Sequence, residues 1–475
     1  MKRMLKNIGF VLLLVPALAI LFFGPRQKAG VPKGRVVVTY WEKWTGPEEQ
    51  QMKIIVNDFN ATVGLKKHIF VQFVSMADID KKTLIATAAG VPPDIAGLWD
   101  NDVAQYASLG ALTPLGHLAR EYGITRKTYK KVYWTACHYH GRLYALVSTP
   151  ADIALVYNKL IFKRDAAKLR AAGLNPNQAP QTIRQLDAYA RVLTKFGPQG
   201  QLLRAGFLPT EPGWYFPEVF FWFGGHIWNA KTGKFTLTSP QDVAAYRWIA
   251  GYSKWLGPQA INSFTSAQGN FESAQNPFML GTLAMEQQGP WMANYIYSYA
   301  KHLSTLHWSY AKALTMPLAE RRNNYGWAVA PFPSAVPGMK DVSYCGFDAF
   351  VIPRGAKHIK QAFTFIAYVQ RQKVMEHLCG MMSKNSPLRK VSKDFIEHNP
   401  NPYIDVFEKL ANSPNARGLP QIPIMPQVID ELNTEAQAVA LLERTPTRAL
   451  EKAQHRLQRE YDSYERVQRL RRAEK

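Results

Sequence analysis

Cysteine is scarce in this 475-residue chain, and the spacing of the cysteines excludes several kinds of site. Cys137, Cys345 and Cys379 can form at most one disulfide within the chain, and none has the C-x-x-C spacing of a metal-thiolate site. We expect all three to be small buried side chains. The chain also lacks a phosphate-binding G-x-x-x-x-G-K segment, so we do not expect it to hydrolyse a nucleotide. The sequence gives no reason to expect a metal or a cofactor.

Acidic residues are few as well, 35 against 58 lysines and arginines, which gives a net charge of +23. Part of the excess lies in residues 444–475, where Arg466, Arg469, Arg471 and Arg472 form a cluster. A basic surface fits nucleic acid, an anionic membrane surface or an acidic medium. Because the sequence carries none of the common nucleic-acid motifs, we expect no nucleic-acid partner and keep contact with a membrane surface open.

An apolar run, residues 8–23, follows the basic residues Lys2, Arg3 and Lys6. A positive flank before an apolar core is typical of a secretion signal, so we predict an exported body, periplasmic or at the cell surface. Residues 1–30 fit either a signal peptide or a retained membrane anchor, because the small-x-small site of the segment lies inside the run. No cysteine lies near the end of the run, so we do not expect a lipid-modified cysteine.

Strand and helix patterns alternate in the first part of the exported body. Runs of β-branched and aromatic residues predict strands at 35–41, 68–74 and 95–99, and apolar residues at helical spacing predict helices that follow them. Short connections between strands and helices favour an α/β fold with a largely parallel sheet. In such sheets ligands bind at the carboxyl ends of the strands, so the residues after each strand are candidate site residues.

The rest of the chain predicts shorter elements and a helical end. The ranges are 143–147, 153–157 and 283–286 for strands, and 243–256 and 436–472 for helices. Capping boxes that begin at Thr45 and Thr182 predict two helix starts. No low-complexity linker separates independent domains.

Five segments occur in a fixed order between residues 36 and 370. They are VVVTYWEKWTGPEEQQMKIIVNDFN, PPDIAGLWDNDVAQYASLGALTPL, GRLYALVSTPADIALVYNKLIF, NPFMLGTLAMEQQGPW, and YGWAVAPFPS with GFDAFVIPRGAKHIKQAFTFIAYV behind it. Together they resemble the extracellular solute-binding proteins of family 1, the maltose- and glycerol-phosphate-binding type. The chain departs from the common pattern of that family because it lacks a lipid-anchor cysteine, is unusually basic, and carries two tryptophans beside Glu42.

The resemblance implies an α/β, two-lobed periplasmic-binding-protein fold with a hinge of three crossing segments. The crossings are expected near 148–150, 344–349 and 394–400. The expected lobes are discontinuous, with 35–148 and 347–395 in lobe 1 and 149–346 and 396–475, which ends in a basic helix, in lobe 2.

The resemblance also implies a function without catalysis. The protein would be the substrate-binding component of an ABC importer, which captures a sugar or oligosaccharide between the lobes. Hinge closure would then present the carbohydrate ligand to the transmembrane subunits of the ABC permease. Sensing in place of import is not distinguished by the sequence.

The expected ligand site combines aromatic and polar side chains from both lobes. Aromatic rings stack on the apolar faces of sugars, and carboxylates or amides bond to their hydroxyls. By position in the resembling segments, the predicted ligand-binding residues are Trp41, Glu42, Trp44, Trp99, Asp100, Asn101, Asp152, Trp214, Tyr215, Trp291, Phe347 and Asp348. Neighbours at a strand end point in different directions, so Trp41 and Trp44 need not both reach the ligand. Asp100 and Asn101 could instead cap the following helix.

The sequence is also compatible with other functions and ligands. A glycoside hydrolase would need two facing carboxylates, and Glu42 with Asp100 is the pair that could be mistaken for them. A glycerol-phosphate ester would need a basic side chain in the cleft, for which Lys43 and Arg389 are the candidates. A polyol or a peptide would keep the fold and change the ligand. His138 and His140 could bind a metal, although an exposed loop or strand explains their spacing as well. We expect Trp222 and Trp228 in the core.

Overall fold

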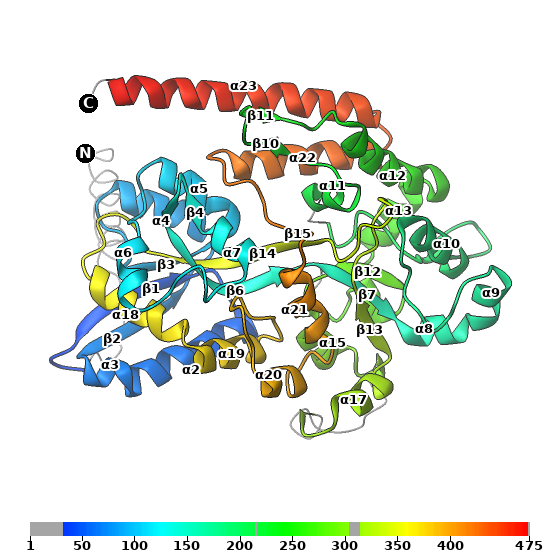
Figure 1. The fold of residues 1–475 in the computed structure, drawn as a ribbon. Helices are drawn as coiled ribbons and strands as arrows, with labels where there is room; N and C mark the ends of the chain where they lie inside the picture. The colour runs from blue at the N-terminus through cyan, green and yellow to red at the C-terminus, as the bar shows by residue number, and fades with distance from the viewer. Residues whose placement is uncertain (1–31, 214–215, 271, 304–313, 474–475) are drawn as a thin grey trace, which may run out of the picture.

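The structure is a computed structural model, and it describes residues 32–213, 216–270, 272–303 and 314–473. Its elements form two lobes, each built around its own β-sheet (Figure 1). The predicted signal peptide or anchor at residues 1–30 lies outside the described residues, as do Trp214 and Tyr215. Within the described ranges, no helix is both long and apolar enough to cross a membrane.

The first lobe is built on a six-stranded sheet. Its strands are β1 (Val36–Glu42), β2 (Ile69–Ser75), β3 (Ile95–Trp99), β6 (Ala145–Asp152), β14 (Ser343–Val351) and β15 (Ala416–Arg417). The three strands predicted at the start of the body are confirmed, and β1 runs parallel to both β2 and β3. The expectation of a largely parallel sheet is only half correct, because β14 lies antiparallel between β3 and β6.

Helices cover the first sheet and connect its strands. They are α2 (Gly46–Ala61), α3 (Val63–Lys66), α4 (Ile79–Ala88), α5 (Asp100–Ser108), α6 (Gly116–Glu121), α7 (Lys131–Ala136), α18 (Ile359–Val369) and α19 (Gln372–Met381). The helix start predicted at Thr45 is confirmed, but the capping box is wrong, because the Thr45 side chain makes no cap bond. Glu48 and Glu49 place negative charge in the first turn of α2 instead, where the helix dipole favours it.

The second lobe is built on a three-stranded antiparallel sheet, ordered β12-β7-β13. These strands are β7 (Ala154–Asn158), β12 (Met285–Gln288) and β13 (Trp327–Ala330). The helices nearby are α8 (Lys159–Arg164), α9 (Ala166–Ala171), α10 (Ile183–Leu193), α11 (Val219–Trp222), α12 (Pro240–Leu256), α13 (Pro258–Ser266), α14 (Pro277–Leu280), α15 (Met292–Tyr299) and α17 (Leu318–Asn324). At α10 the predicted cap is confirmed, since the Thr182 side chain accepts a bond from the Gln185 amide at 3.2 Å.

Strands connect the two lobes directly. β6 pairs with β14 in the first sheet, and after the single residue Ile153 the chain continues as β7, the central strand of the second sheet. β14 runs alongside β6 in the opposite direction, from Ser343 to Val351. The lobe boundaries that we predict from the resemblance remain a prediction.

The chain ends in four helices, of which the first two pack against the core that contains the first lobe and the last two pack against the core of the second lobe. They are α20 (Lys393–Glu397), α21 (Ile404–Asn412), α22 (Met425–Ala440) and α23 (Pro446–Ala473). The single helical stretch predicted at 436–472 is therefore two helices, broken where Leu442 adopts a φ of +60°. All three cysteines are buried, as predicted, and none of them forms a disulfide.

Candidate functional site

The two connecting strands present different side chains on their two faces. Cross-strand partners in an antiparallel pair point to the same side, and successive residues alternate. Asp348 therefore shares one face with its partner Thr149, and the Thr149 hydroxyl donates to Asp348 Oδ2 at 2.9 Å. Cys345 and Asp152 are partners on the other face. We call these the Asp348 face and the Asp152 face.

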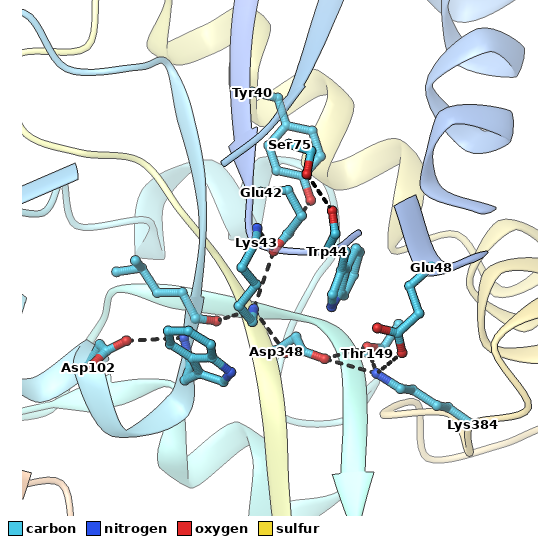
Figure 2. Close-up of polar contacts among 12 residues, drawn as sticks. Tyr40, Glu42, Lys43, Trp44, Glu48, Ser75, Asp102, Thr149, Asp348 and Lys384 are labelled. Atoms are coloured by element: carbon cyan, nitrogen blue, oxygen red, sulfur yellow. Dashed lines mark hydrogen bonds and ion pairs between the residues drawn. The ribbon is translucent and has the colours of Figure 1, made fainter. Parts of the chain in front are cut away.

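Five charged side chains alternate in sign on the Asp348 face (Figure 2). Lys43 Nζ lies 3.3 Å from Glu42 Oε1 and 2.9 Å from Asp348 Oδ1. Lys384 Nζ lies 3.0 Å from Asp348 Oδ2 and 3.6 Å from Glu48 Oε1. Asp348 thus bridges two lysines, each of which has a second carboxylate. We call Glu42, Lys43, Asp348, Lys384 and Glu48 the charge row.

Burial and charge pairing set the protonation of the charge row. Burial alone would raise the pKa of Asp348, but Lys384 and Lys43 hold it well below its ordinary value. Burial would lower the pKa of Lys43 and of Lys384, yet their carboxylate neighbours raise both. Burial raises the pKa of Glu42 despite Lys43 beside it. Asp348 and the two lysines are therefore charged at neutral pH.

Glu42 is the fully buried end of the charge row. Its carboxylate accepts bonds from the Tyr40 hydroxyl at 2.5 Å and from the Lys43 amide at 2.9 Å. It is fully buried and occupies the space in front of Gly97, where any side chain would collide with it. Glycine at position 97 permits this close approach. Glu42 therefore lies buried beside Lys43, with which it forms an ion pair.

Three tryptophans surround the two lysines. Lys43 Nζ lies 5.5 Å from the ring centre of Trp44 and 5.0 Å from that of Trp99. Lys384 Nζ lies 5.6 Å from the rings of both Trp44 and Trp291. These distances fit cation–π attraction, which also fixes the orientation of the rings. Trp99 is 41% exposed, whereas Trp44 and Trp291 are nearly buried.

The tryptophans come from both lobes. Trp44 follows β1 and Trp99 ends β3, so both belong to the first lobe, whereas Trp291 directly precedes α15 of the second lobe. The lobes touch beside Trp291, because Asn294 of α15 accepts a bond from the Ser383 hydroxyl at 2.5 Å. Residues far apart in the sequence are thus brought around one set of charges.

Asp100 forms a second contact on this side of the strands. It is buried at the start of α5, and the Tyr344 hydroxyl of β14 lies 3.2 Å from its Oδ2. Burial raises the pKa of Asp100 to about 7. Asp102, rather than Asp100 or Asn101, caps the helix, because its Oδ2 accepts the Trp99 amide at 3.3 Å. The side-chain amide of Asn101 donates to Asp102 Oδ1 at 3.1 Å.

The Asp152 face holds a different kind of group. Asp152 accepts bonds from the Tyr133 hydroxyl at 2.6 Å and from the Asn385 amide at 2.9 Å. Burial raises its pKa to about 7. Phe347 is buried on the same face, with its ring edge-on to Tyr133. The structure thus separates Asp152 and Phe347 from Asp348, although all three were predicted at one site.

The remaining predicted aromatic residues have separate positions. Trp41 is half-buried and packs against the core of the first lobe. Trp222 is fully buried, stacked on Phe332, as expected for a core residue. Trp228 is only partly buried, against Phe235 and Tyr461, so the expectation of a core position is partly correct.

A wide groove opens beside the charge row. Its volume is about 1570 Å³, and Glu48 and Trp291 lie in its wall. The other walls come from α2, α15, α19 and α20, with Gln51, Tyr295 and His377 among the lining residues. The volume exceeds the few hundred to about 1,000 Å³ of pockets for drug-sized ligands. The groove therefore has room for more than one sugar ring.

Sequence reasoning missed two members of the charge row. Lys384 lies in the loop after α19, which carries no motif, and only the fold brings it to Asp348. Glu48 was assigned to a capping box, but its carboxylate faces Lys384. Arg389, a candidate for phosphate recognition, is exposed, and its amide bonds to the carbonyl of Thr128. In the part of the chain that the structure describes, no cluster of three or more His, Cys, Asp or Glu side chains could hold a metal.

Comparison with known proteins adds an independent finding. Residues 55–404 match the family model described as bacterial extracellular solute-binding protein. The solved structure of CpMnBP1 with mannotriose bound is 28% identical, with a TM-score of 0.72 over 89% of this chain and 99% of that one. An ABC transporter solute-binding protein from Thermotoga lettingae, bound with α-D-tagatose, shares the fold at 21% identity and a TM-score of 0.63, over 89% and 99% of the two chains.

A curated relative is similar over a shorter span. The maltotriose-binding protein of Pyrococcus abyssi is 21% identical over 267 residues, which are 56% of this chain and 51% of the relative. The alignment thus spans about half the length of that relative.

Proposed function

This chain belongs to the bacterial extracellular solute-binding protein family, and we propose that it captures a neutral oligosaccharide between its lobes for an ABC importer. The observation that carries the proposal is the charge row beneath three tryptophans that come from both lobes. The likeness to a structure with mannotriose bound, at 28% identity and nearly full length, supports a carbohydrate as the ligand.

The charge row favours a neutral ligand over a phosphate ester. Lys43 and Lys384 are the basic groups next to the tryptophans, and both are already paired with carboxylates. Binding a phosphate would require at least one of them to leave Asp348, which would then keep only one of its two buried partners. A sugar hydroxyl needs no such exchange, since it donates to a carboxylate and accepts from an ammonium group at once.

The tryptophans supply the apolar part of the proposed site. Trp99, Trp44 and Trp291 offer flat faces that suit the C–H faces of sugar rings. The groove in whose wall Trp291 lies has the volume for an oligosaccharide. We propose Trp44, Trp99, Trp291 and Asp348 as ligand contacts and Asp100 as a nearby hydroxyl acceptor. Asp152 and Phe347, which are buried on the opposite face, are left out of this set.

A binding function fits these residues better than hydrolysis does. A glycosidase needs two carboxyl groups on either side of the scissile bond, about 5–10 Å apart. Glu42 is fully buried and already accepts bonds from Tyr40 and Lys43, so it offers no free carboxylate to a sugar. We therefore propose a binder that releases its ligand unchanged to the transmembrane subunits of an importer, from an exported position outside the cell membrane.

A calorimetric titration tests the proposal. The purified chain is titrated with mannotriose, maltotriose and glycerol phosphate in parallel, and each mixture is then analysed for cleaved sugar. We expect saturable binding of at least one oligosaccharide, no binding of glycerol phosphate and no cleavage product. Binding of glycerol phosphate alone would overturn the neutral-sugar assignment and keep the fold, whereas release of cleaved sugar would overturn the binder assignment.

A further inference from the structure

The last helix, α23, packs against the second lobe as far as Tyr464, and its last turns lie beyond these contacts. Ala449, Leu450, Ala453 and Leu457 are buried in the core of the second lobe. Figure 1 shows α23 along the outer edge of the molecule, with its C-terminal turns (red) running on past α22 (orange). All of Arg466, Val467, Arg469, Leu470 and Arg471 are exposed there. We call these five residues the basic tail.

Basic side chains in the two halves of α23 differ in their partners. Lys452 lies 2.7 Å from Glu435 of α22, and Arg456 lies 2.6 Å from Glu431 of the same helix. Within the described part of the chain, the three arginines of the basic tail form no ion pair. Lys452 and Arg456 are therefore paired with carboxylates of α22, whereas the three arginines of the basic tail have no such partner among the described residues.

Carboxylates just before the basic tail are already engaged. Asp462 accepts a bond from Gln458 at 2.8 Å and lies 3.7 Å from Lys234. Glu465 interacts with the Tyr461 hydroxyl, whose pKa rises to about 12 because of burial and this carboxylate. Neither belongs to the basic tail, which has no acidic residue of its own.

Two apolar side chains accompany the arginines. Val467 is 42% exposed and Leu470 is 59% exposed, and their i, i+3 spacing puts them on one face of the helix. Elsewhere on α23 the leucine and alanine side chains at positions 449, 450, 453 and 457 are buried. An exposed apolar pair flanked by arginines is the arrangement of helices that lie in a membrane interface.

We propose that the basic tail binds the surface of an anionic phospholipid membrane. The three arginines would attract the negative headgroups, and Val467 and Leu470 would enter the boundary between headgroups and acyl chains. The tail lies outside the charge row, so this contact would hold the protein at a membrane without covering the proposed sugar site. An acidic protein would be attracted by the same charges, but attraction between charges does not explain the exposed apolar pair.

A fluorescent label next to the basic tail tests the proposal. Ser463→Cys offers an exposed thiol one turn before the tail, whereas the native cysteines are buried. The full chain is labelled there with a polarity-sensitive dye and mixed with phosphatidylcholine vesicles, with or without phosphatidylserine. We expect a blue shift only with phosphatidylserine. The shift should be largely lost when salt rises from about 0.1 M to about 1 M, which cuts the Debye length from about 10 Å to about 3 Å.

Matched variants separate the basic tail from the net charge of the protein. Replacing Arg466, Arg469 and Arg471 with serine should weaken vesicle binding about 100-fold, since each arginine near such a surface contributes roughly fivefold. Val467→Ser with Leu470→Ser should weaken it about tenfold. Three exposed lysines outside α23, Lys66, Lys67 and Lys163, form the control triple, and their replacement with serine should leave the shift intact.

Three outcomes would overturn the proposal. The first is a dye shift that is equal with neutral and anionic vesicles. The second is an equal loss of binding in the control triple. The third is a dye shift with polyglutamate that depends on the same arginines, together with no shift on vesicles, which would assign the basic tail to an acidic protein partner.

Discussion

The two faces of the β6–β14 strand pair carry carboxylates whose pKa values are shifted in opposite directions. Asp348 lies between two lysines, which hold its pKa well below the ordinary value. Asp152, a few residues away on the neighbouring strand, bonds to Tyr133 and Asn385, and burial raises its pKa to about 7. Since both carboxylates are buried, the partners that the fold supplies decide the charge.

The loop after α19 serves both faces at once. Lys384 bonds to Asp348 on one side of the strand pair, and the next residue, Asn385, bonds to Asp152 on the other. The Asp348 face opens toward tryptophans of both lobes, whereas the Asp152 face is closed by Tyr133 and Phe347. In the proposed function, the Asp348 face binds the ligand and the Asp152 face contributes to stability.

Removal of the charge on Asp348 should have the largest effect. Asp348→Asn leaves Lys43 and Lys384 buried without their shared carboxylate, which should lower the free energy of unfolding by about 3–5 kcal/mol. The measurement is urea unfolding at pH 7. The matched change on the other face, Asp152→Asn, should cost less than Asp348→Asn. Equal losses in the two variants would show that the faces do not differ in this way.

The second largest effect should be a pH dependence of stability that comes from the Asp152 face. The unfolded pKa of an aspartate is about 3.9, and that of buried Asp152 rises to about 7, so its contribution is present below about pH 4 and is lost as the pH rises to about 7. Asp152→Asn removes this dependence. The stability of the wild type relative to the variant should fall by about 2–4 kcal/mol from pH 4 to pH 7. A difference that stays constant over this range would contradict the assignment.

Ligand affinity should fall when a residue beside the Asp348 face is replaced, and should not change when a residue of the Asp152 face is replaced. Trp291→Ala should weaken oligosaccharide binding by about 2 kcal/mol, or roughly 30-fold, because a large aromatic contact is lost. Phe347→Leu, on the Asp152 face, should cost about 1 kcal/mol of stability and leave the affinity unchanged. Calorimetric titration of both variants checks this. A comparable loss of affinity in Phe347→Leu would return that residue to the ligand site.

Trp99 should show the smallest effect on the fold and a distinct effect on binding. Because its side chain is 41% exposed, Trp99→Ala should change the unfolding free energy by only about 0.5 kcal/mol. The affinity for the sugar should still fall about tenfold, or about 1.4 kcal/mol. A Trp99→Phe variant, which keeps a flat ring, should recover part of the affinity. Unchanged affinity in the alanine variant would remove Trp99 from the site.

Local patterns in the sequence predicted much of this fold. Alternating strand and helix signals located β1, β2 and β3 to within one residue, and the ordered segments indicated two lobes. The same signals identified the tryptophans after β1 and β3, because strand ends are places where a parallel sheet exposes side chains.

Contacts between distant segments could not be predicted in this way. Lys384 meets Asp348 only because α19 and its loop pack against the connecting strands. Asp152 and Asp348 both looked like cleft residues, since the sequence does not reveal how β6 and β14 pair. The register of that pair, and the two-residue alternation of the side chains, decide which carboxylate meets Lys43 and Lys384.

A crystal structure of the chain with mannotriose is the most direct test of the central claim. We predict that the sugar rings lie on the Asp348 face, within about 4 Å of Trp99 and Trp291. Hydroxyls of the sugar should bond to members of the charge row. Sugar bound away from the three tryptophans, or on the Asp152 face, would contradict the account.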